Sequence, residues 1–135
     1  MRTYQVWMVK ALLQDVPRMN RARGTMEARK DTLTPEEKKI LQGLQKIADE
    51  VANAYTILTE REKQIIYNFY FQKVGATETA KIVNIKNLKT IQVMTIYIIE
   101  KMSAACLSVF SEAETFWEYD EQCRYNRIKE YMVLK

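Results

Sequence analysis

The sequence predicts an all-α protein of five to six helices. Apolar residues recur at three- and four-residue intervals along most of the chain, which is the period of a helix with one buried face. Only three Gly and two Pro occur in 135 residues, which favours long helices and few tight turns. No segment alternates between apolar and polar residues as a half-buried strand does. The length suits one helical domain, 1–135.

The N-terminal segment, 1–33, is expected to hold an amphipathic helix followed by a basic connector. Trp7, Leu12 and Leu13 belong to the apolar face of a helix from Thr3 to about Asp15. Pro17 is expected to end this helix, and Gly24 to prevent a continuous helix beyond it. The basic residues of the connector are Arg18, Arg21, Arg23, Arg29 and Lys30. The connector is either a solvated loop or an arm that binds a nucleic-acid backbone.

Two strong helix-start signals follow. Thr34 precedes Pro35, Glu36 and Glu37, which suit the first turn of a helix, and 34–57 then carries a long amphipathic pattern. Thr59 and Glu62 have the spacing of a capping box and open the next helix.

The segment 58–102 has the proportions of a helix-turn-helix. A supporting helix from Glu60 is followed by a short helix capped by Thr77 and by a longer helix from Leu88, with Asn87 as its N-cap. Ala80 supplies the small residue at the helix crossing, and Ile85 supplies the apolar plug of the turn. The buried stripe of the third helix is expected at Ile91, Thr95 or Met94, Ile98 and Met102.

This pattern resembles the DNA-binding region of sigma factors that contacts the upstream promoter element. It is still more similar to the small phage transcriptional activators of the RinA and ArpU kind. The resemblance covers about residues 58–102 and implies a regulator that binds promoter DNA and activates late or structural genes. The matching positions are Leu58, Arg61, Glu62, Tyr70, Phe71, Thr79, Ala80, Ile85 and Thr90. The chain departs from the family at Lys86, which replaces the usual serine of the turn, and in one extra residue before Thr90.

Basic residues lie around the third helix of the motif and not on it. Members of the family usually carry several basic residues on this reading helix, whereas residues 91–100 contain none here. Phosphate contacts must therefore come from flanking residues. The expected DNA contacts are Lys86, Asn87, Lys89, Thr90, Gln92 and Val93, with Lys73, Lys81 and the arginines Arg18, Arg21 and Arg23 as further sources of charge. The alternative for the helix start is an ordinary solvated surface.

The third helix is apolar on almost every side, and the C-terminal segment, 103–135, is rich in aromatic residues. Val93, Ile96, Tyr97 and Ile99 are expected to be buried against the C-terminal helix or a second subunit. Ser111 and Glu114 suggest a capping box that opens a last helix reaching about Met132. The aromatic residues of the core or of a dimer interface are Phe110, Phe116, Trp117, Tyr119, Tyr125 and Tyr131, together with Tyr97 for the interface.

The sequence gives little support to catalysis or metal binding. It contains no His, and Cys106 and Cys123 lack metal-ligand spacing, so both are expected to be reduced and structural. No Gly-rich phosphate loop or nucleophile elbow is present, and we expect no enzymatic activity and no cofactor. The N-terminal helix is too polar for a signal peptide or a membrane span, which predicts a cytoplasmic protein without a membrane partner.

Two functions therefore remain open. The first is a transcriptional regulator, expected to be a homodimer, that binds double-stranded DNA. Its net charge of +4 agrees with this. The second is a protein-interaction module that keeps the shape of the motif but uses its apolar third helix to bind RNA polymerase or another regulator.

Overall fold

The computed structural model describes residues 2–125, with side chains from residue 6 onward. Within that span every regular element is helical and no strand occurs, which confirms the all-α class. The helical segments outnumber those expected, because a further helical stretch follows at 121–125. The elements are α1 (Arg2–Ala28), η1 (Lys30–Thr32), α2 (Pro35–Thr56), α3 (Glu60–Ile66), η2 (Tyr67–Phe71), α4 (Gly75–Ile82), α5 (Leu88–Leu107) and α6 (Phe110–Tyr119).

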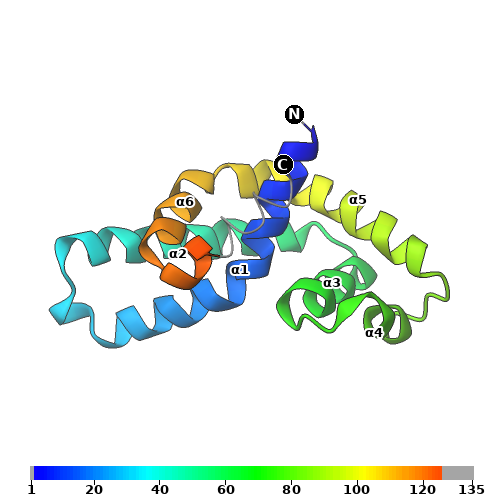
Figure 1. The fold of residues 1–135 in the computed structure, drawn as a ribbon, viewed down its shortest axis with the longest axis horizontal. Helices are drawn as coiled ribbons and strands as arrows, with labels where there is room; N and C mark the ends of the chain where they lie inside the picture. The colour runs from blue at the N-terminus through cyan, green and yellow to red at the C-terminus, as the bar shows by residue number, and fades with distance from the viewer. Residues whose placement is uncertain (1, 126–135) are drawn as a thin grey trace.

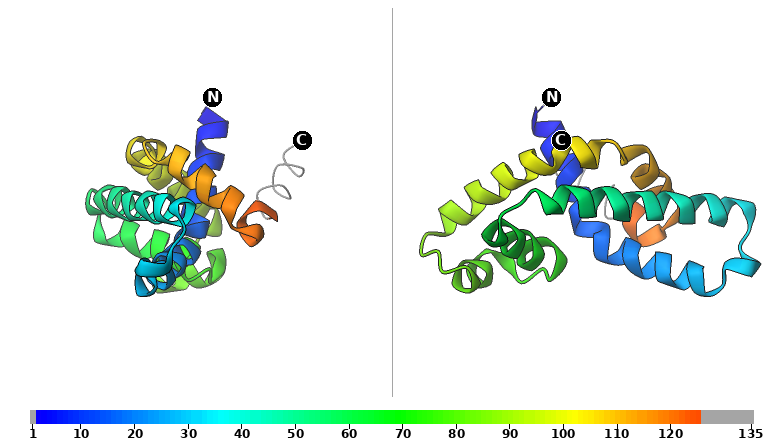
Figure 2. Two further views of the ribbon diagram at one scale, coloured as in Figure 1. Left: turned by 90° about the vertical axis from the view of Figure 1, so that its left-hand side faces the viewer. Right: turned by 180° about the vertical axis from the view of Figure 1, so that it is seen from behind.

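The helices form an elongated molecule around α2 and α5 (Figure 1). The first part of α1 crosses α5, and its second part runs beside α2 (Figures 1 and 2). Helix α6 packs on α2, while α3, α4 and the start of α5 gather at the opposite end of the molecule (Figure 1). The two ends are therefore built from different elements and joined through α2 and α5.

Helix α1 corrects the expected boundary near Asp15. It continues to Ala28 with Pro17 inside it, and its ribbon changes direction along its length (Figure 1). A proline in a helix removes one hydrogen bond and kinks the helix, at a cost of about 3 kcal/mol. Leu13, Val16 and Met19 are all buried around this position. We infer that their packing against the neighbouring helices offsets that cost, so Arg18, Arg21 and Arg23 lie on a helix and not on a loop, while Arg29 and Lys30 follow its end.

Gly24 also lies within α1. A Cβ at this position would meet no atom within 4 Å, so a larger side chain would fit there and lack of space does not explain the glycine. A glycine inside a helix costs about 1 kcal/mol relative to alanine, which is too little to end a helix held by tertiary contacts.

The core runs the length of the molecule and takes side chains from every long helix. Its largest fully buried members include Leu12 and Leu13 of α1, Ile47 of α2, Ile98 of α5 and Phe116 of α6. The two cysteines are free and buried, and burial raises the pKa of each thiol to about 12. Buried neutral thiols agree with the structural role expected of them.

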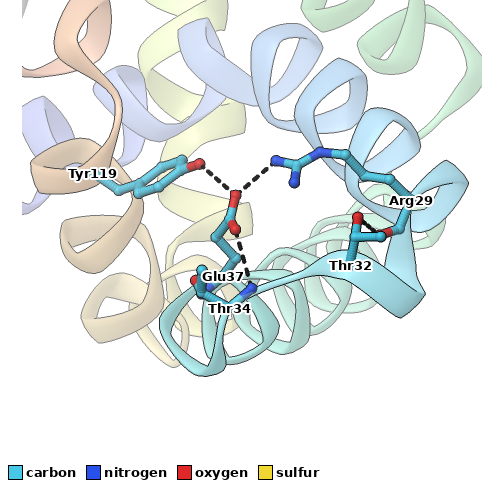
Figure 3. Close-up of polar contacts among 5 residues, drawn as sticks. All are labelled: Arg29, Thr32, Thr34, Glu37 and Tyr119. Atoms are coloured by element: carbon cyan, nitrogen blue, oxygen red, sulfur yellow. Dashed lines mark hydrogen bonds and ion pairs between the residues drawn. The ribbon is translucent and has the colours of Figure 1, made fainter.

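A polar group that we call the corner cluster joins the end of α1, the start of α2 and the end of α6 (Figure 3). Glu37 accepts hydrogen bonds from the Arg29 guanidinium at 2.6 Å and from the Tyr119 hydroxyl at 3.3 Å. Its other carboxylate oxygen accepts from the backbone N–H of Thr34 at 3.1 Å, completing the capping box at the start of α2. The Thr32 hydroxyl donates to the Arg29 carbonyl at 2.9 Å, which closes the turn between the helices.

The C-terminal helix does not begin at the predicted box of Ser111 and Glu114. Helix α6 begins at Phe110 without a side-chain cap and ends at Tyr119. Asp120 interrupts it, and its carboxylate accepts the backbone N–H of Cys123 at 3.0 Å at the start of the next helical stretch. The expected end of this helix near Met132, and the aromatic Tyr131, lie outside the described residues.

Candidate nucleic-acid interface

The candidate interface lies at the end of the molecule where α3, α4 and the start of α5 meet (Figure 1). Helix α3 begins at the predicted capping box, in which the Thr59 hydroxyl accepts the Glu62 N–H and the Glu62 carboxylate accepts the Thr59 N–H. The other oxygen of Glu62 accepts a hydrogen bond from Lys101 of α5 at 2.7 Å. Although burial opposes ionisation, this contact and the Thr59 N–H lower the pKa of Glu62. A charged and partly buried pair thus fixes α3 against α5.

Arg61 provides a second tie, from α3 to the end of α4. Its guanidinium donates to the Val83 carbonyl at 3.2 Å, where the turn before α5 begins. Lys and Arg side chains that bond to the last carbonyls of a helix satisfy acceptors that have no partner within the helix. The resemblance had marked Arg61 as a motif position, and here it holds the end of α4.

Helix α4 begins two residues earlier than the predicted cap at Thr77. Gly75 has φ of +86°, a left-handed conformation that glycine adopts at low cost, and α4 starts there without a side-chain cap. The hydroxyl of Thr79 donates to the Gly75 carbonyl at 2.7 Å and is buried. Ala80 is buried as expected, and α4 packs against α5.

The turn between α4 and α5 is fixed by its backbone. Asn84 is left-handed, with φ of +59°, a conformation that Asn tolerates better than most residues. The next N–H, of Ile85, donates to the Ala80 carbonyl at 2.8 Å, and the Ile85 side chain packs against the core. Asn87 is the N-cap of α5, as predicted: its side-chain oxygen accepts the Lys89 N–H at 2.9 Å.

Helix α5 has one buried face and one exposed face. The predicted buried stripe is confirmed at Ile91, Thr95, Ile98 and Met102, all of which are buried. Ile99 is buried as well, as expected. This face anchors α5 so that its opposite side projects from the molecule.

The exposed face corrects part of the expectation for the apolar residues. Val93 is 60% exposed, Ile96 46% and Tyr97 59%, so the C-terminal helix does not cover them. The Lys101 ammonium lies 5.1 Å from the centre of the Tyr97 ring and restrains one side of this surface. We call Val93, Ile96 and Tyr97 the apolar face of α5.

Most of the predicted DNA contacts share this exposed side or the turn before it. Lys86, Asn87, Lys89, Thr90, Gln92 and Val93 are all exposed. Lys81 and Lys86 line one hollow, of about 500 Å³, together with Asn84, Ile85 and Leu88. We call Lys81, Lys86 and Lys89 the basic edge. Within this edge, Lys81 forms a loose ion pair with Glu78 at 3.5 Å.

The predicted arginine contacts lie elsewhere. The part of α1 that carries them is directed away from the start of α5 (Figure 1). Arg18 donates to the Asp120 carboxylate at 2.8 Å, which raises the pKa of the guanidinium and ties α1 to the C-terminal segment. Arg23 is half-buried and lines a cavity of about 260 Å³ between α1 and α2, whereas Arg21 is exposed. These residues do not extend the basic edge.

The predicted interface aromatics divide between core and surface. Phe116 and Trp117 are buried within the chain, and Phe110 is half-buried against the core. Tyr119 belongs to the corner cluster, and Tyr97 stands exposed on α5. Of the two roles left open for these residues, their burial supports the core for Phe110, Phe116 and Trp117.

The contacts that hold α3, α4 and α5 together were not predicted from the sequence. The Lys101–Glu62 pair and the Arg61 contact join residues 39 and 22 positions apart, and no short motif signals either of them. The exposure of Ile96 was missed because its neighbours in sequence are equally apolar. Its three-residue spacing from Val93 is the signal that places the two on one side of the helix.

Comparisons with family models, curated proteins and solved structures give no match for this chain. The resemblance to the phage activators therefore stays a prediction. Among the described residues, no three His, Cys, Asp or Glu side chains gather as a metal site would require. No single described helix is long and apolar enough to cross a membrane; α5 and α6 pass that test only as a pair, which is bent by 86°.

Proposed function

We propose that the chain is a transcriptional regulator that binds duplex DNA through the basic edge and the start of α5. The observation that carries this proposal is the N-terminal part of α5, which is polar, exposed and projects from the molecule. The three lysines of the basic edge lie on or beside it, and two of them, Lys81 and Lys86, line the same hollow. In this proposal α3, α4 and α5 act as a helix-turn-helix, with α5 entering the major groove. The resemblance at residues 58–102 supports the same function and adds activation of phage genes.

The contacts divide between phosphates and bases. Lys81, Lys86 and Lys89 would neutralise phosphates, since lysine acts as a point charge that needs no fixed geometry. Gln92 is exposed on α5 and suits bidentate pairing with adenine. Asn87 is less suited to that role, because its side-chain oxygen already accepts the Lys89 N–H. Thr90 and Val93 offer methyl groups that suit contact with thymine.

A second candidate function is supported by the apolar face of α5. Val93, Ile96 and Tyr97 are large and exposed on the same helix, as in surfaces that bind another protein. In this alternative the chain is an interaction module, and its target is RNA polymerase or another regulator.

Replacing Lys86 and Lys89 together by Ala tests the DNA-binding proposal. We expect the variant to bind a labelled random duplex at least about tenfold more weakly, because each lysine that meets a phosphate adds about one unit to the salt dependence. Fluorescence anisotropy at fixed salt measures the affinity.

The matched control replaces Lys38 and Lys39 by Ala. Both lysines are exposed on α2, and replacing them changes the net charge by the same amount as replacing Lys86 and Lys89. An equal loss of affinity in both variants would mean that only net charge matters, and the placement of the interface would be wrong.

A further inference from the structure

The exposed side of α5 carries four residues at a regular helical spacing, two of which, Lys89 and Val93, also belong to the proposed DNA contacts. Lys89, Val93, Ile96 and Glu100 follow one another at intervals of four, three and four residues, and Tyr97 lies beside them. This is the spacing of positions that face a partner helix in a two-helix seam. Lys89 and the apolar face are exposed, and Glu100 is half-buried.

The seam is complementary to itself in one orientation. If two α5 helices lie antiparallel about an axis between Met94 and Thr95, Val93 of one copy faces Ile96 of the other. The same rotation places Lys89 opposite Glu100, at both ends of the seam. A parallel pair would instead set Lys89 against Lys89 and Glu100 against Glu100. The charges therefore favour the antiparallel arrangement, which is a closed two-fold contact.

We propose that a second copy of this chain covers the apolar face of α5 in this antiparallel contact. The apolar residues form its centre and the Lys89–Glu100 pairs form its rim, as in other protein interfaces. The seam from Lys89 to Glu100 is about 16 Å long, at 1.5 Å per residue. A contact of this size falls below the usual area of stable dimers, so we expect a weak association that appears only at high protein concentration.

This dimer contact also prevents DNA binding, a consequence that rests on the proposed function. It covers Lys89 and draws the two α5 helices together, so neither can enter a major groove while paired. Dimer formation and DNA binding therefore exclude each other, and a high concentration of protein reduces the fraction that is able to bind DNA.

Sedimentation velocity without DNA tests the contact with charge-exchanged variants. We expect the wild-type chain to associate as its concentration rises from about 10 to 300 µM. Lys89→Glu places two acids together and Glu100→Lys places two lysines together, so each single variant stays monomeric. The double variant K89E/E100K restores the opposite charges and associates again.

Ile96→Gln is the variant for the apolar centre, because Ile96 is exposed and its replacement leaves the core unchanged. It is expected to stay monomeric with an unchanged circular-dichroism spectrum. Single charge variants that still associate, or a double variant that stays monomeric, would overturn the antiparallel contact. A wild-type chain that is monomeric at about 300 µM would overturn the second copy as occupant and leave a different protein as the ligand of this face.

The failure of this inference is distinguishable from failure of the proposed function. Sedimentation is measured without DNA, so its outcome does not depend on DNA binding. Ile96→Gln keeps Lys81, Lys86 and Lys89, and a monomeric Ile96→Gln that fails to bind duplex DNA would contradict the function while leaving the dimer contact intact.

Discussion

Glu37 shows how one carboxylate can hold three elements together. The hydrogen bond from the Arg29 guanidinium, with the Thr34 backbone N–H, lowers the pKa of Glu37 from its ordinary 4.5 to about 2. The folded state therefore favours the charged form more than the unfolded state does. The stabilisation is present above pH 4.5 and is lost as the pH falls toward 2. It is reduced by solvent, because the cluster lies at the surface.

Replacing Glu37 by Gln tests this contribution. Glutamine keeps a side chain suited to the capping box but removes the charge that Arg29 contacts. We expect a lower melting temperature than wild type at pH 7 and a difference that shrinks as the pH falls from 4.5 toward 2. Thermal melts across this range measure it, with Glu36→Gln, an exposed neighbour, as the control. A difference that stays constant with pH would show that the charge of Glu37 does not act as described.

At the scale of single elements, local sequence signals identified the start of a helix where a side-chain cap fixes that start. Thr34 was recognised from the proline and the two acids that follow it, and Thr59 and Asn87 were recognised as capping side chains close to the N–H groups that they accept. Thr77 and Ser111 look alike in sequence but cap no helix, since α4 and α6 begin at Gly75 and Phe110. Packing outside the segment decides such cases, and sequence alone does not show it.

Helix α5 shows both the strength and the limit of periodicity. The three- and four-residue spacing identified its buried stripe, because that face must meet the core. On the opposite side Val93, Ile96 and Tyr97 are just as apolar, and composition predicted their burial as well. The chain leaves them exposed, because no other described helix passes over them.

Two isoleucines of α5, one on each face, test the assignment of a buried and an exposed face. Ile98→Ala removes a fully buried side chain and is expected to cost about 2 to 5 kcal/mol of unfolding free energy. Ile96→Ala, two residues earlier, alters an exposed side chain and is expected to change it by about 0.5 kcal/mol or less. Urea denaturation at low protein concentration measures both. Equal losses in the two variants would contradict the assignment of the two faces.

At the scale of the whole molecule, contacts between distant residues decide which charges can act together. Arg18 meets Asp120 across 102 residues, and Lys101 meets Glu62 across 39. The first pair engages one of the arginines that the sequence suggested for DNA, and α1 carries the others away from the basic edge (Figure 1). Sequence order alone placed the arginines and the lysines in one binding surface. The bend and full length of α1 separate them.

The proposed interface therefore contains few basic residues, and their number predicts how strongly DNA binding should depend on salt. Three lysines of the basic edge are expected to neutralise about three phosphates. The logarithm of the binding constant then falls with the logarithm of salt concentration with a slope of about −2.7. Between about 50 and 200 mM salt, the affinity for duplex DNA should drop roughly 40-fold.

Binding of the wild-type chain to a random duplex at these two salt concentrations is the most direct test. The chain should be kept below about 10 µM, where the antiparallel contact of α5 is expected to be dissociated. A drop of roughly 40-fold agrees with binding through the basic edge, and a much steeper drop would mean that the arginines of α1 also contact DNA. No binding at either concentration would contradict the account and favour a protein as the ligand of α5.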